Sequence, residues 1–97
     1  MIRLENILVA SDFGEASNSA LNYGRQLARS FGARLHVIHV VDNTFLWTAV
    51  DGIGADAATV QAELEDTARE KLRLSLSPED RQELKAVLVV RAAASPA

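Results

Sequence analysis

Short apolar runs alternate along the chain with longer segments in which apolar residues recur every three or four positions. The short runs are residues 7–10, 34–41 and 84–90. Each is apolar on both of its predicted faces, which is typical of strands buried on both sides in a parallel sheet. The pattern therefore predicts three buried strands.

Two longer segments have the helical period. The first ends at Gly32, a residue suited to the left-handed position after a helix, and its interior Gly24 suits a close approach to the sheet. The second begins with Asp56 as a cap and runs to about Leu76. Ser77-Pro78 then predicts a short turn before the third strand. The predicted apolar stripes are Ala16, Ala20, Leu21, Gly24, Leu27, Ala28 and Phe31 in the first helix and Val60, Leu64, Ala68 and Leu72 in the second.

The loop between the second strand and the second helix, residues 44–55, has no clear period and carries Phe45, Leu46 and Trp47. Loops of this length are often lids or contact surfaces. An apolar plug folded onto the domain's own surface is an equally good interpretation.

The order strand, helix, strand, helix, strand predicts two βαβ units and an α/β fold with a parallel sheet. Because such crossovers are right-handed in about 98% of cases, two crossovers that step in the same direction place both helices on one face. The other face, although apolar, is left uncovered. We therefore expect another chain, an exchanged segment or a further C-terminal half to cover it, and a lone monomer to be marginally stable or to aggregate.

Composition limits the chain's function. The 97 residues allow one domain, and the net charge of -3, with basic residues spread among acidic ones, argues against nucleic acid as a main partner. We expect no membrane span and no signal peptide, and we predict a cytoplasmic location. The absence of cysteine excludes disulfides, thiolate metal sites and a cysteine nucleophile.

Asp12 is the strongest candidate for chemistry, because it follows the first strand at the sheet edge where ligands of α/β folds bind. A second interpretation, compatible with the first, is a capping box between Asp12 and Glu15 at the start of the helix.

His36 and His39 lie three residues apart in the second strand and so point to opposite faces. They cannot share a metal ion, and we predict that each is a hydrogen-bonded, partly buried ring. No serine, histidine and acid set has the spacing of a catalytic triad.

Residues 7–15, Ala20-Leu21, residues 35–42 and residues 87–91 together resemble the universal stress protein family. The resemblance covers the whole chain but only about two-thirds of the family domain, so residues 1–97 are identified as a single truncated domain. It implies a three-layer α/β/α architecture of the adenine nucleotide alpha hydrolase type with strand order 3-2-1-4-5. Here that architecture is incomplete, with about three strands and two long helices. It also implies a homodimer, and the uncovered face predicts a homo-oligomer or a segment-exchanged dimer.

The resemblance further implies a cofactor, ATP or another adenine nucleotide. It places the cofactor-binding positions at Ala10, Ser11, Asp12 and Val40, with Ala10 where proline is common. The family's phosphate-binding stretch, G-x2-G-x9-G-[ST], is missing, which predicts weakened or lost binding. The expected function is a non-enzymatic regulator set by an adenine nucleotide. The alternative is a nucleotide-independent interaction module in the stress response, and an enzyme is the least favoured reading.

Overall fold

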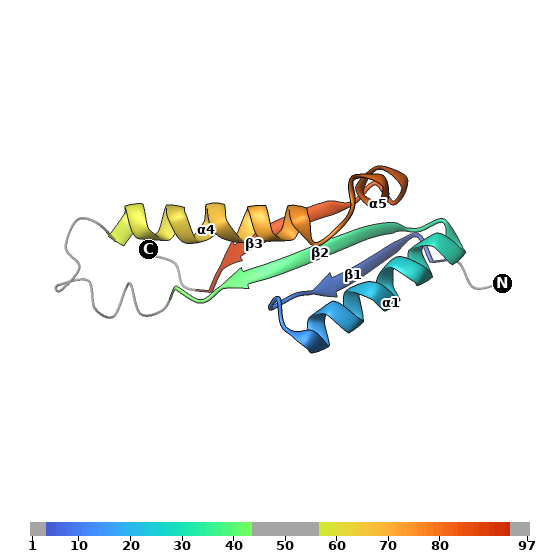
Figure 1. Cartoon of the computed structure of the whole chain (residues 1–97), viewed down its shortest axis with the longest axis horizontal. Coiled ribbons are helices and arrows are strands. Elements are labelled where there is room, and N and C mark those ends of the chain that lie inside the picture. The colour runs from blue at the N-terminus through green and yellow to red at the C-terminus, as the bar shows by residue number, and fades with distance from the viewer. Residues whose placement is uncertain (1–3, 44–56, 94–97) are drawn as a thin grey trace.

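The computed structural model describes residues 4–43 and 57–93, which form three strands and three helices. The predicted loop at residues 44–55, with Phe45, Leu46 and Trp47, and the predicted cap Asp56 lie outside the described residues. In chain order the elements are β1 (Asn6–Ala10), α1 (Glu15–Phe31), β2 (Arg34–Val41), α4 (Ala57–Leu74), α5 (Pro78–Glu83) and β3 (Val87–Ala92) (Figure 1).

The three strands form one parallel sheet in the order β1-β2-β3, so their carboxyl ends all point to the same end of the molecule (Figure 1). Val9 is the partner of Val37 across the first pair of strands, and Val37 is the partner of Leu88 across the second. The α/β class and the parallel sheet predicted from the alternating pattern are thereby confirmed.

One face of the sheet carries the core. Leu35 and Val37 of β2 are fully buried there, together with Ala28 of α1 and Leu72 of α4. Residues of both long helices and of all three strands belong to a single apolar cluster. Both long helices therefore pack on the same face, as the handedness of the two crossovers predicts.

The opposite face of the sheet has no helix of the described segments against it. Leu8 is 70% exposed and Val40 is 53% exposed, although both lie in strands. Ile38 and Val89, which are neighbours across β2 and β3, are only half-buried on the same face. We call this surface the open face. Its apolar side chains are exposed to solvent.

Helix α1 lies close to β1 because Gly24 has no side chain. A Cβ atom at this position would stand 2.6 Å from Val9 Cγ2, which is closer than two carbon atoms can approach without a shift. The close approach predicted for Gly24 is thus confirmed. The helix ends at Gly32, which has the left-handed backbone (φ 64°) expected of a helix-ending glycine.

The apolar stripe of α1 is buried over a narrower arc than the sequence predicts. Leu21, Gly24 and Ala28 are buried, whereas Ala16 and Ala20 are exposed and Phe31 is 46% exposed. The sheet ends at β1, so no further strand of the described segments covers this flank. The other flank of α1 faces α5, where Arg25 and Arg29 both pair with the buried Asp80.

The third strand begins later than predicted, at Val87 instead of Leu84. Ser77 caps the N-terminus of α5 by accepting a 3.1 Å hydrogen bond from the Asp80 N–H, and Pro78 occupies its first turn. The predicted short turn is therefore a six-residue helix, which takes up the chain to Glu83. Likewise, α4 ends at Leu74, two residues before the predicted Leu76, although Leu76 is still buried in the core.

Candidate functional site

The four predicted binding residues lie together at the carboxyl end of the sheet. Ala10 ends β1, Ser11 and Asp12 follow it, and Val40 lies near the end of the neighbouring β2. All four line one hollow of about 280 Å³, which Ser17 of α1 and Ile38 of β2 complete. Because Ala10, Ile38 and Val40 alternate with the core residues of their strands, this hollow lies on the open face.

Asp12 is held by the first turn of α1. Its Oδ1 accepts hydrogen bonds from the Ser17 hydroxyl at 2.6 Å and from the Gly14 N–H at 2.8 Å. The Asp12 N–H in turn donates to Ser17 Oγ at 3.0 Å. The hydrogen bond from Ser17, followed by that from Gly14, lowers the pKa of the Asp12 carboxyl below its ordinary value of 3.8. Asp12 is thus an exposed, oriented carboxylate at neutral pH.

The predicted capping box between Asp12 and Glu15 is wrong. The N-cap of α1 is Gly14, which makes no side-chain capping hydrogen bond, and Glu15 is already the first helical residue. Ser17 takes the reciprocal role instead, five residues after Asp12. The capping box does not form because Phe13 and Gly14 make a turn between the strand and the helix. Glu15 is therefore not three residues after the N-cap residue, where a capping box requires it.

Ser11 shapes the turn through three hydrogen bonds and is buried. Its N–H donates to the Ile38 carbonyl at 2.8 Å, which ties the end of β1 to β2. Its hydroxyl accepts from the Phe13 N–H at 3.2 Å, and its carbonyl accepts from Nδ1 of His39 at 2.7 Å. Ser11 therefore lines the hollow while its hydroxyl accepts a hydrogen bond within the turn.

The hollow combines two small apolar surfaces with one anionic group. Ala10 and Val40 offer flat apolar contact, and the Asp12 carboxylate offers hydrogen-bond acceptors beside them. This combination suits a ligand with an apolar ring and adjoining N–H or hydroxyl donors. Asp12 would repel a phosphate placed against it, and none of the described residues that line this hollow is a glycine or a basic residue.

The two histidines lie on opposite faces, as predicted. His36 Nε2 is 2.9 Å from Asn6 Oδ1, near the start of the strands. His39 lies on the helix-covered face at their carboxyl end, where its ring contacts Phe13 at a centroid distance of 4.3 Å. Within residues 4–43 and 57–93 no group of three metal-binding side chains gathers.

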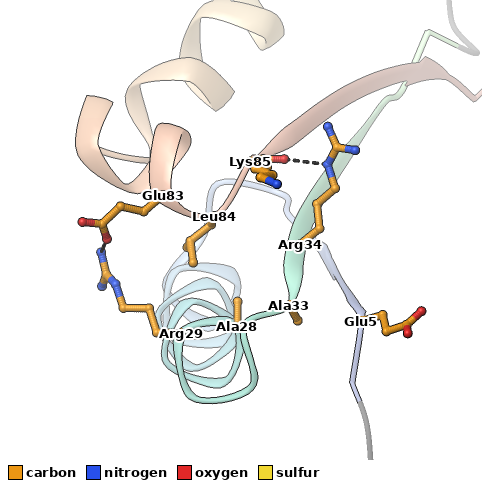
Figure 2. Close-up of a pocket in the computed structure, with 9 residues that line it drawn as sticks. Glu5, Ala28, Arg29, Ala33, Arg34, Glu83, Leu84 and Lys85 are labelled. Atoms are coloured by element: carbon orange, nitrogen blue, oxygen red, sulfur yellow. Dashed lines mark hydrogen bonds and ion pairs between the residues drawn. The ribbon is translucent and has the colours of Figure 1, made fainter.

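A larger hollow, of about 610 Å³, lies at the amino ends of the strands. Figure 2 shows the residues that line it. Ala28, Ala33 and Leu84 form its apolar floor, and charged side chains surround them. Arg29 pairs with Glu83 at 3.3 Å, and Arg34 Nε donates to the Lys85 carbonyl at 2.8 Å. Size favours this hollow, but both of its arginine side chains already have partners within it, and it lies at the amino ends of the strands. We therefore place the candidate site at the carboxyl ends, where ligands of open α/β sheets bind.

Ser17 and Ile38 are the site residues that sequence reasoning did not find. Ile38 is the register partner of Ala10, and register is set by how the strands pack. Ser17 is a helical serine in the first turn after a strand-end aspartate. Its spacing from Asp12 matches no standard cap, so only the turn geometry brings the two side chains together.

Comparison with known proteins is informative about the family. A family model described as the universal stress protein family matches residues 3–97. A search of curated proteins gave no match. None of the helices in the described segments is both long and apolar enough to cross a membrane.

Two solved structures share the fold. A protein from the universal stress protein family of Burkholderia pseudomallei aligns with a TM-score of 0.70 at 23% identity, covering 94% of this chain and 64% of that chain. The universal stress protein UspA of Lactobacillus plantarum aligns with a TM-score of 0.64 at 20% identity, covering 95% of this chain and 63% of that chain. The chain thus spans a little under two-thirds of the length of these relatives.

Proposed function

Because the chain belongs to the universal stress protein family, we propose that it is a non-enzymatic, cytoplasmic regulatory domain whose hollow at the carboxyl end of the sheet takes the base and ribose of an adenine nucleotide. The observation that carries the proposal is the single hollow lined by Ala10, Asp12 and Val40. The nucleotide is ATP or another adenine nucleotide, since the described groups contact the part of the ligand that all of them share.

The proposed affinity is low, and the structure gives two physical reasons for expecting this. The hollow opens on the open face, so a base lying against Val40 would be covered on one side only. No glycine loop of the described segments offers backbone N–H groups to a phosphate. We expect AMP, which carries fewer phosphates, to bind at least as tightly as ATP to this chain.

Isothermal titration calorimetry with ATP, AMP and cyclic AMP tests the proposal. Asp12→Asn removes the acceptor charge and should weaken AMP binding about tenfold, the loss typical of one charge-assisted hydrogen bond. Glu15→Gln is the matched control, because it removes an exposed acid of the same turn that does not line the hollow. An absence of heat at millimolar nucleotide, or equal losses in both variants, would contradict the proposal.

A second candidate function is a nucleotide-independent module that assembles through the open face. The specific observation is the exposure of Leu8 and Val40 on the apolar open face of the sheet, which is unfavourable in a stable monomer. We propose a homo-oligomer or a segment-exchanged dimer as the assembly.

Sedimentation velocity separates this second function from the first. The unchanged chain should sediment as an oligomer, and Leu8→Lys should shift it toward the monomer because a charge in an apolar contact costs desolvation energy. Ser19→Lys, on the exposed side of α1, is the control and should leave the size unchanged. An oligomer that persists unaltered in Leu8→Lys would rule out assembly through the open face.

A further inference from the structure

A second pocket lies beside the candidate nucleotide hollow, on the helix-covered side of the sheet. It encloses about 550 Å³, within the range of roughly 300–1,000 Å³ typical of small-molecule sites. Phe13 comes from the β1–α1 turn, His39 and Val41 from β2, and Leu64 and Lys71 from α4. Val40 borders both hollows, but the side walls of this pocket belong to α4, which takes no part in the nucleotide site.

The pocket has an aromatic wall whose position is imposed by a strained backbone. Phe13 has a φ of 66°, a left-handed conformation that bulky residues rarely adopt. Its ring packs on the His39 ring with the planes tilted by 34°. His39 is oriented in turn, because its Nδ1 is held by the Ser11 carbonyl. Strain of this kind persists where the surrounding contacts over-determine the geometry, and it is concentrated at binding sites.

Helix α4 supplies the rest of the pocket in two parts. Its buried side provides apolar contact through Leu64 and Ala68, next to Val41 of β2. Its rim presents Thr67 and Lys71, one turn apart. Lys71 Nζ lies 5.5 Å from the centre of the Phe13 ring and forms no ion pair with a described residue.

The charges of the rim are separated. Two acidic side chains also line the pocket. Glu63 is two helical turns from Lys71, or about 12 Å along the axis, and Asp42 follows the carboxyl end of β2, the end of the strand at which α4 begins. The separation of Glu63 from Lys71 exceeds the screening length of roughly 8–10 Å at physiological salt, so Glu63 does not cancel the field of Lys71. The Lys71 end of the pocket therefore combines a cation, the Thr67 hydroxyl and a flat aromatic wall.

We propose that this pocket binds a small aromatic carboxylate. The ring of the ligand lies between the Phe13 wall and the apolar surface of Val41, Leu64 and Ala68. The ligand's carboxylate accepts hydrogen bonds from the Lys71 ammonium and the Thr67 hydroxyl. The site is independent of the proposed nucleotide site, with which it shares only the β1–α1 turn and the backbone at Val40.

The test uses 2-naphthoate as the probe, added to the 97-residue chain and followed by the NMR signals of the His39 and Phe13 rings. We expect both rings to shift with saturation in the micromolar to millimolar range. The neutral isostere 2-naphthamide should bind at least about tenfold more weakly, because it cannot form the charged hydrogen bond to Lys71. Lys71→Met should weaken naphthoate binding by a similar factor and leave naphthamide binding unchanged.

Three controls make the outcome decisive. Glu63→Gln should change the affinity for naphthoate by less than about twofold, because of its distance from the carboxylate. Leu8→Gln should also have no effect, since Leu8 lies on the open face. Excess AMP should not displace naphthoate, whatever the result of the nucleotide titration. Equal binding of naphthoate and naphthamide, loss of binding in Leu8→Gln, or no shift of the His39 and Phe13 signals would each overturn the proposal.

Discussion

Asp12 and Phe13 are consecutive residues whose side chains serve opposite sides of the sheet. The Asp12 carboxylate lines the hollow on the open face, whereas the Phe13 ring lies against His39 on the helix-covered face. Phe13 has a left-handed backbone (φ 66°) in the turn between the strand and the helix. The turn therefore contributes one side chain to each of the two candidate sites.

At this scale the ionisation of Asp12 gives a direct prediction. The Ser17 hydroxyl is the largest cause of its lowered pKa, so Ser17→Ala should raise the pKa of Asp12 toward 3.8. Carbon-13 NMR of the Asp12 carboxyl through an acid titration measures this. Ser19→Ala is the control, because Ser19 lies in the same helix without contacting Asp12. An unchanged Asp12 pKa in Ser17→Ala would show that the hydrogen bond does not form in solution.

The lowered pKa of Asp12 also determines how its contribution to the free energy of unfolding changes with pH. The Asp12 pKa is lower in the folded chain than in the unfolded one, so the unfolded state binds the proton more readily. Its contribution to the free energy of unfolding is therefore present above about pH 4 and is lost as the pH falls through the folded pKa. In Ser17→Ala this part of the acid sensitivity should decrease.

At the scale of elements, the packing of α1 on β1 depends on one missing side chain. Gly24 faces Val9, Leu35 and Ile7, and an added Cβ would lie 2.6 Å from Val9 Cγ2. Alanine has a higher helix propensity than glycine, which by itself would raise the free energy of unfolding of Gly24→Ala by about 1 kcal/mol. The overlap with Val9 acts in the opposite direction. The overlap should dominate, because Val9 is buried and its β-branched side chain has few alternative rotamers.

Gly24→Ala should therefore lower the free energy of unfolding by about 1–3 kcal/mol, as overpacked cores do. Urea unfolding followed by circular dichroism measures it. Val9→Ala removes the methyl group that the new side chain would meet, so the double variant should lose less than the sum of the two single losses. A neutral or stabilised Gly24→Ala chain would mean that α1 can move away from β1 at little cost.

At the scale of the whole molecule, the open face leaves apolar side chains such as Leu8 and Val40 exposed to solvent. Parallel sheets are usually covered on both faces, so we expect burial of this face to stabilise the chain. If copies of the chain cover one another, folding and association are linked by mass action.

We accordingly expect the midpoint of thermal unfolding to rise with chain concentration. Circular dichroism melts over a hundredfold range of concentration test this, with the Leu8→Lys variant as the comparison. In that variant the midpoint should be lower and nearly independent of concentration. A cooperative transition at the same temperature for all concentrations of the unchanged chain would contradict the expectation.

Several features could be predicted from the sequence because they depend on neighbours along the chain. Residues 34–41 are the second strand with the predicted bounds, and the two histidines lie on opposite faces because a strand repeats every two residues. The left-handed backbone at Gly32 and the cap at Ser77 follow from local backbone chemistry. The shared face of the two long helices followed from the handedness of βαβ units alone.

Other features depended on tertiary structure. The short helix α5 decides whether the third strand starts at Leu84 or at Val87. The buried Asp80 holds this helix against Arg25 and Arg29 of α1. The turn brings the side chains of Asp12 and Ser17 together, and the strand register places Ala10 beside Ile38. Sequence periodicity specifies which residues avoid water, but the distances between segments remote in the chain are set only when those residues pack together.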